Sequence, residues 1–465
     1  MNQKKWLLRL VNHVSQPLGK VTLTLATLLC STIPAQAVSF NFTYDPGVSF
    51  EYKWAAETAA LYWQDILRDD ATINIHLDVA SSSKLPQGVL GGAIPAFLNN
   101  ASYSSFRTAL TNDRRSSNDF TAVANLPGVS NYNYLDFVAN GINNGTYSNN
   151  THWALGVANS ALNINHAVVK SDITLTTANA KALGLINKHA TSLDGTIVLN
   201  NLANTNYLWE TLRTSGVSAN EFDLTTVLIH EMGHILGFVS GVDAVNDTNS
   251  NQTSSNLGKY ATPLNLFSRD GFFNTDGTLI YGASSIFTID GGRTNLGYWS
   301  TGADTDLALG YNQGGDGWQA SHFKSTYTDA IMNPALSAGM RRNVTSREIT
   351  FLDAIGWDTR NKTTSDSTLQ NLAYSIALNK GNIDQTVSLN NMFNQSRWGG
   401  TTTTTTFNQT TELADFLAQQ GFFQQGTFWS HLPVESASVP EPTTTAGLFA
   451  LGLLGLAMHR QKKFN

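Results

Sequence analysis

Residues 224–240 have the sequence LTTVLIHEMGHILGFVS, and this stretch decides the fold of the chain. It contains His230-Glu231-Met232-Gly233-His234, the HExxH pattern. Four residues advance a helix by about 400°, so the two histidines lie on one face, one turn apart. Both imidazoles can then reach one Zn²⁺ ion, and Glu231 projects beside them, where it can take a proton from a zinc-bound water. The sequence predicts a catalytic helix that begins at about Leu224 and is capped by Asp223.

A catalytic zinc site needs a third protein ligand, and the sequence offers two candidates. Three positions after His234 stands Gly237, and three further stands Ser240, which is a poor zinc ligand. Asp243 follows closely in the chain, whereas His322 lies far downstream, ten positions before Met332.

The pattern resembles the metzincin metallopeptidases, whose motif is HExxHxxGxxH. Gly237 matches the glycine at which the chain turns after the helix, but Ser240 replaces the last histidine. Leishmanolysin-type metzincins also have HExxHxxGF, then a long insertion, then an isolated ligand histidine shortly before a methionine turn. This resemblance implies that His322 is the third ligand and that Met332 is the methionine beneath the metal. Asp243 remains the alternative ligand.

Periodicity predicts the elements around the motif. Apolar residues recur at helical spacing within residues 51–70, and Ile73, Ile75, Leu77 and Val79 alternate as in a half-buried strand over residues 71–79. His76 falls on the opposite side and is expected in solvent. Residues 196–200 indicate a further strand, and a capping box over residues 345–348 opens a helix that ends at residue 355. Residues 81–150 show no pattern that assigns them.

The resemblance implies an α+β fold: a two-subdomain zincin with a mixed sheet, the catalytic helix and a long loop-rich insertion over residues 243–320. In such a fold an edge strand before the catalytic helix binds substrate by backbone pairing. The residues expected to supply it are Ile197, Val198, Leu199 and Asn200.

The two ends indicate the compartment. Residues 1–37 read as a secretory signal with basic residues, an apolar stretch and the small-x-small site Ala35-Gln36-Ala37. The single cysteine, Cys30, lies inside this signal. The exported chain therefore has no disulfide, no catalytic thiol and no cysteine-based latency switch.

At the other end, Val439-Pro440-Glu441-Pro442 precedes an apolar run and a basic cluster. This arrangement resembles the PEP-CTERM sorting signal of bacteria with two membranes, which implies recognition by an exosortase and removal of the tail. A permanent membrane anchor is the alternative. The protein is expected outside the cell or in the cell envelope, with the tail in a membrane before processing.

Four regions follow: the signal peptide (1–37), a metallopeptidase domain (38–358), a Thr/Gln-rich appendage (359–438) and the sorting signal (439–465). The formal net charge is −6, and it becomes −13 without the seven basic residues of the two ends, so a nucleic-acid partner is excluded. Calcium is a further candidate metal, because aspartates lie in Gly/Asn-rich loops, namely Asp243, Asp247, Asp270, Asp276 and Asp316.

The sequence thus predicts a secreted or cell-surface zinc-dependent endopeptidase with one catalytic Zn²⁺. Its expected partners are a protein or peptide substrate, signal peptidase and an exosortase. Glu231 is expected to act first as general base and then as general acid. The alternative is a non-catalytic envelope or biofilm-matrix surface protein that retains a zincin fold. The intact Glu231 argues against that alternative, because a structural zinc site needs no base.

Overall fold

The computed structural model describes most of the chain between residues 38 and 431, and the account below is confined to those residues. They are residues 38–126, 138–139, 153–154, 172–241, 243, 262–270, 285–300, 316–395, 406–408, 412–419 and 428–431. The signal peptide and the sorting tail lie outside them. Among the described residues no helix is long and apolar enough to cross a membrane.

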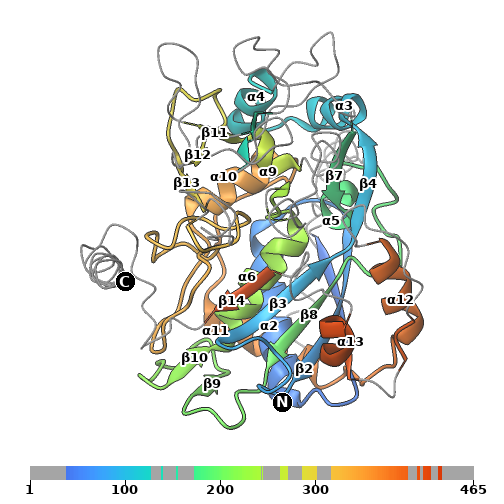
Figure 1. Cartoon of the computed structure of the whole chain (residues 1–465), viewed down its shortest axis with the longest axis vertical. Helices are drawn as coiled ribbons and strands as arrows, with labels where there is room; N and C mark the ends of the chain where they lie inside the picture. Colours follow the sequence, from blue (N-terminus) through green and yellow to red (C-terminus); the bar gives the residue numbers. More distant parts are fainter. Residues whose placement is uncertain are drawn as a thin grey trace, which may run out of the picture. The chain divides into compact units, whose positions relative to one another are not determined.

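A mixed five-stranded sheet forms the centre of the fold (Figure 1). Its strands follow the spatial order β1 (Ser39–Tyr44), β2 (Thr72–Ala80), β8 (Gly195–Asn200), β3 (Val89–Pro95) and β14 (Phe428–His431). The first three run parallel, β3 is antiparallel to β8, and β14 is antiparallel to β3. The predicted combination of helices with a mixed sheet is confirmed.

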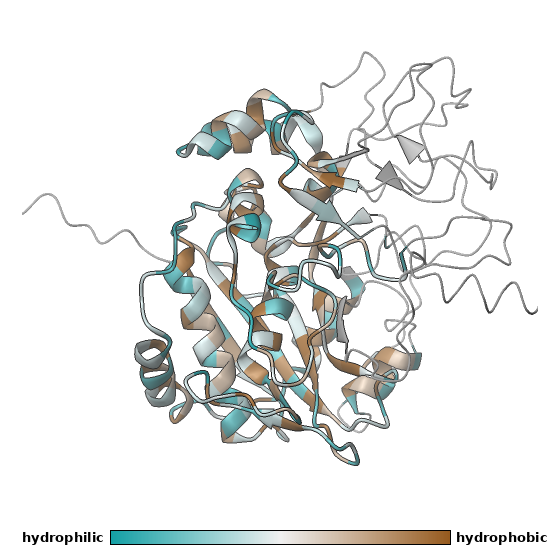
Figure 2. Ribbon diagram, turned by 90° about the vertical axis from the view of Figure 1, so that its left-hand side faces the viewer, coloured by the Kyte–Doolittle hydropathy of each residue, from teal (hydrophilic) through white to brown (hydrophobic). Residues whose placement is uncertain are grey.

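Both faces of this sheet are covered. The helices α2 (Phe50–Ile66) and α6 (Leu224–Leu236) pack on one face, in the same core as Ile197 and Leu199. Val198 points the other way, into a second core with apolar residues of α12 (Thr386–Gln395) and α13 (Leu413–Gln419). Apolar colour accordingly concentrates on the central strands and on the helix faces against them (Figure 2).

The segment after residue 358 is part of this compact fold. The helix α11 (Asp366–Ala377) packs along α2, and the Trp54 indole Nε1–H donates to the Gln370 carbonyl over 2.7 Å. The described residues between 38 and 431 belong to a single compact unit, and β14 joins the central sheet. The described part of residues 359–438, expected as a Thr/Gln-rich appendage, therefore packs against the rest of the fold.

Two expectations about strands also need correction. Residues Ile197–Asn200 were expected at an edge, but β8 pairs with β2 on one side and with β3 on the other. Its backbone is consequently unavailable to a substrate. His76 was expected in solvent, yet it is fully buried, and its Nδ1 lies 3.1 Å from the hydroxyl of Thr43, its neighbour on the paired strand β1.

The remaining predicted elements occur with small shifts. The first helix stops at Ile66 instead of residue 70, because Leu67 is extended and bridges to Thr359. Residues 81–150, which showed no pattern, contain β3 and four further described elements. These are β4 (Phe97–Ser102), α3 (Tyr103–Asp113), α4 (Ser117–Ala124) and β5 (Val138–Ala139).

The insertion over residues 243–320 is built in part from short elements. Its described parts are α9 (Pro263–Leu266) and an antiparallel sheet of β11 (Ser268–Asp270), β12 (Ser285–Phe287) and β13 (Gly297–Trp299). After it comes α10 (Ser346–Ala354), which opens with the predicted capping box. The other short elements are β6 (Trp153–Ala154), β7 (Asp172–Thr176), α5 (Thr177–Ala182), β9 (Leu208–Glu210) and β10 (Glu221–Asp223).

Candidate metal centre

The helix α6 is fixed at its start by a buried ionic network. Asp223 is its N-cap, and its carboxylate accepts from the Thr226 amide at 2.6 Å. The same carboxylate also accepts from Arg213 Nη1 at 2.9 Å and from Arg341 Nε at 2.7 Å. Because both oxygens of the buried acid are paired, the network holds this end of the helix in one position. The predicted cap is confirmed.

The end of α6 is fixed by a turn that also orients a histidine. Gly237 has φ +134°, a backbone conformation that other residues rarely adopt, and a Cβ there would lie 2.6 Å from Ile355 Cδ1. This turn brings the Phe238 carbonyl back to His234, whose Nδ1 contacts it at 2.7 Å. The glycine predicted at this turn is therefore required by the geometry as well as by the motif.

The segment that carries His322 is anchored by Asp243. The Asp243 carboxylate accepts from the Ala320 amide at 2.6 Å, the Ser321 amide at 3.0 Å and the Ser321 hydroxyl at 2.5 Å. The Ser240 amide in turn donates to Ser321 Oγ at 2.8 Å. Asp243 and Ser240, which follow the HExxH helix, thus hold the residue next to His322 at the site.

Met332, the methionine expected beneath the metal, is fully buried and packs against Gly233 inside the HExxH motif. Its amide donates to Glu348 Oε1 at 3.1 Å, and its carbonyl accepts from the Phe323 amide at 2.9 Å. A Cβ on Gly233 would lie 2.5 Å from Met332 Sδ, so the glycine inside the motif makes room for the methionine. The preceding residue, Ile331, presents its carbonyl to His230 Nδ1 at 2.7 Å.

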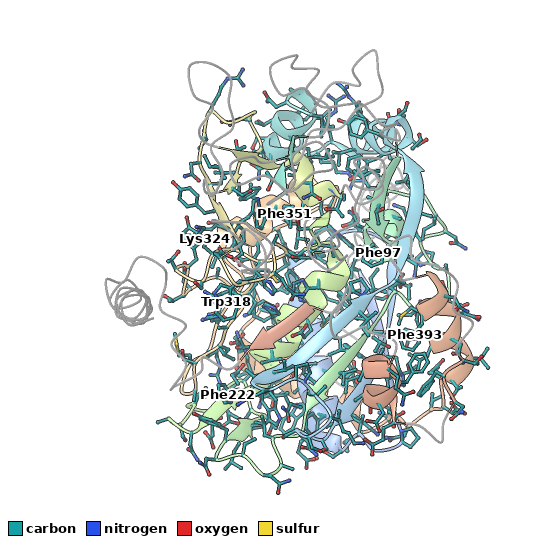
Figure 3. All side chains as sticks on the ribbon, in the orientation of Figure 1. Phe97, Phe222, Trp318, Lys324, Phe351 and Phe393 are labelled. Carbon is teal, nitrogen blue, oxygen red and sulfur yellow. The ribbon has the colours of Figure 1, made fainter. Side chains whose placement is uncertain are left out.

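An aromatic cluster packs against the segments that follow His234 and His322. Phe238 and Phe351 have ring centroids 4.4 Å apart, and Trp299 stacks on Phe323 at 4.3 Å. Figure 3 marks Phe351, which comes from α10. Phe323 follows His322 in the chain, and the Phe238 carbonyl contacts His234. This packing therefore restricts the backbone that positions two of the three histidines.

The three predicted histidines come together. His230 Nε2 lies 3.1 Å from His234 Nε2, and His322 Nε2 lies 3.2 Å from each of them. All three side chains are buried. Among the described residues they are the one group of three or more His, Cys, Asp or Glu residues placed to hold a metal ion.

The protonation of these rings follows from their outer contacts. Each Nδ1 faces a carbonyl oxygen, of Ile331, Phe238 and Gln319 respectively, at 2.7 to 3.1 Å. A carbonyl oxygen only accepts hydrogen bonds, so each neutral ring carries its hydrogen on Nδ1. The three Nε2 lone pairs then converge on one point. Burial, and next the neighbouring His230, hold the pKa of His234 well below its usual value, which favours the neutral ring.

Such a donor set fits zinc. Three nitrogens bound to tetrahedral zinc at about 2.0–2.1 Å lie about 3.3–3.4 Å from each other, close to the observed separations. Converging lone pairs repel one another unless a cation lies between them, and the carbonyl partners of Nδ1 are the usual outer contacts of metal-binding histidines. Glu231, on the same helix, is fully buried beside this group.

Other candidates do not join this group. Both carboxylate oxygens of Asp243 accept hydrogen bonds from Ala320 and Ser321, the residues before His322. Ile197–Asn200 lie on the interior strand β8. Of the calcium candidates, Asp247, Asp276 and the side chain of Asp270 lie outside the described residues, so calcium stays a prediction. Sequence reasoning missed Ser321 and the role of Glu348. The capping box did identify Glu348 as a helix residue, but its contact with Met332 is tertiary.

Comparison with known families matches residues 438–461 to the PEP-CTERM protein-sorting motif. This confirms the prediction for the tail and marks an exported protein of the cell envelope or exterior of a bacterium with two membranes. Processing by an exosortase during export is implied by the motif. Searches of curated proteins and of solved structures gave no match.

Proposed function

We propose that this exported protein is a zinc-dependent endopeptidase with a metzincin-like arrangement. The observation that carries the proposal is the convergence of three neutral imidazole Nε2 atoms within 3.2 Å beside a buried glutamate. His230, His234 and His322 would hold the ion, with Met332 packed beneath. The resemblance to leishmanolysin-type sequences and the position of Met332 support the same assignment.

Zinc bound there would act as a Lewis acid on water and on the peptide carbonyl. Glu231 would take a proton from the attacking water and deliver it to the departing amine, as the C–O bond forms and the C–N bond breaks. The carbonyl contacts at Nδ1 keep the rings oriented, and the burial of Glu231 raises the strength of its interaction with nearby charge.

The test uses the exported chain, beginning at Val38, with Glu231→Gln and His322→Ala. We expect one zinc per chain in the parent protein and in Glu231→Gln, loss of zinc in His322→Ala, and loss of casein hydrolysis in both variants. His189→Ala is the matched control, because this histidine is exposed and pairs with Asp70 at 3.5 Å. It should retain zinc and activity.

Hydrolysis is measured before and after limited proteolysis, so that a latent form is detected. Full zinc content with no cleavage of any peptide, even after proteolysis, would favour a non-catalytic surface protein instead. Absence of zinc from the parent protein would contradict both.

A further inference from the structure

The sheet has two outer strands, and only one of them lies beside the candidate metal centre. On one side β1 packs against α2; on the other, β3 and β14 both pack against α6, the helix that carries two of the histidines. The approach of β3 to α6 is close: a Cβ on Gly91 would lie 3.2 Å from Val227 Cγ1 of α6. An extended peptide that paired with β3 would therefore run next to the histidines.

That position on β3 is taken by the chain's own C-terminal segment. Phe428, Trp429 and Ser430 pair antiparallel with Ala93, Gly92 and Gly91. Figure 1 shows β14 as the outermost strand, across α6. Extended peptides bind to proteins by adding a strand in this way. The segment thus occupies the backbone groups that a peptide substrate would need.

We propose that β14 is an internal ligand of the peptide-binding edge of β3 and keeps peptides off the metal centre. This inference rests on the proposed endopeptidase function. The occupant is the segment Phe428–His431, and a substrate must displace it in order to pair with β3. The sole cysteine, Cys30, lies in the N-terminal signal segment, so a cysteine-based latency switch is excluded.

The pairing has the features of a contact that can be displaced. It spans four residues, and its register shifts between Ser430 and His431. A short strand with an irregular register offers few backbone hydrogen bonds, each with a modest net effect. The segment ends seven positions before the sorting motif begins at residue 438, so cleavage at that motif leaves β14 attached to the protein.

The experiment compares the full exported chain with the double variant Trp429→Pro/Ser430→Pro. Consecutive residues of a strand direct their N–H groups to opposite sides, so one of the two prolines removes a donor that faces β3. The control, Ser436→Pro/Ala437→Pro, carries the same change beyond the strand. A second variant without proline, Phe428→Gly/Trp429→Ser/Ser430→Gly/His431→Ser, covers the case in which the first fails to fold.

Two readouts are taken: casein hydrolysis, and binding of a fluorescein-labelled peptide with the sequence of residues 424–434. We expect hydrolysis to rise at least ten-fold in the strand variants and not in the control. The labelled peptide should bind the strand variants at least ten-fold more tightly than the parent chain, and it should inhibit them.

The outcomes separate the two proposals. Equal hydrolysis and equal peptide binding by the parent and strand variants would overturn the internal ligand, while the endopeptidase function would stand. If the labelled peptide binds only the strand variants and none of the proteins hydrolyses any substrate, the internal ligand is upheld and the endopeptidase function fails.

Discussion

The contact between Gly233 and Met332 gives a prediction that can be worked out from the structure. A Cβ on residue 233 would lie 2.5 Å from Met332 Sδ and 3.3 Å from Met332 Cε, so Gly233→Ala forces the buried methionine to move. Overpacking of this kind costs about 1–3 kcal/mol. Alanine gains about 1 kcal/mol over glycine inside a helix. The net loss in the free energy of unfolding is therefore about 0–2 kcal/mol.

The decisive measurement is a double-mutant cycle with Met332→Ala. That single change removes a fully buried side chain and should cost about 2–5 kcal/mol. In the double variant the new alanine enters space that the methionine has left, so the clash disappears and the helix propensity remains. We expect the double variant to be about 1–3 kcal/mol more stable than the sum of the single effects, because the overpacking cost disappears.

Urea denaturation of the metal-free exported chain measures this coupling. Gly47→Ala is the control glycine variant, because nothing lies within 4 Å of its added Cβ. Additivity of the two changes within about 0.5 kcal/mol would refute the clash argument. The same displacement should move the Ile331 carbonyl that orients His230, so Gly233→Ala should also bind zinc about ten-fold more weakly.

Three further predictions follow. Asp243→Ala removes the acceptor of three hydrogen bonds next to His322. The change should lower the free energy of unfolding by about 2–4 kcal/mol, measured by urea titration. It should also weaken zinc binding, measured by metal competition. Asp243→Asn, which keeps an acceptor oxygen, should retain one zinc per chain; loss of the metal in this variant would favour Asp243 as the third ligand instead. Burial, together with the charges of Asp358 and Asp113, raises the pKa of Asp69 from 3.8 to about 8, so the folded state holds a proton that the unfolded state releases between these values. The free energy of unfolding should therefore fall as the pH rises from about 4 to 8, and Asp69→Asn should make this pH dependence shallower, by a few kcal/mol across the range; an unchanged slope in thermal or urea melts would contradict this account.

The sequence by itself determined the features that depend on short spacing. The i, i+4 relation places His230 and His234 on one face of any helix they occupy, and Asp223 caps that helix through its own first turn. Gly237 could be recognised because a sharp turn after a helix needs a positive φ. The alternation in residues 71–79 likewise gave β2, since side chains of a strand alternate between its faces.

Strand order was beyond such reasoning. Ile197–Asn200 were assigned to an edge, although the unbroken apolar run Ile197-Val198-Leu199 is typical of a strand buried on both faces. The alternation of apolar and polar residues predicts which face of the sheet a side chain lies on, but it does not predict which strands pair with that strand. For the same reason it placed His76 in solvent, although the ring is fully buried beside Thr43 of the paired strand β1.

Only the tertiary structure decided what assembles the candidate metal centre. His322 is 88 positions from His234, and the two Nε2 atoms meet because Asp243, Ser240 and Glu348 tie their loops together. It also decided that β14, near the C-terminal end, closes the sheet beside α6. Contacts at this separation depend on the packing of the whole core, whereas caps, turns and helix faces depend on neighbours within a few residues.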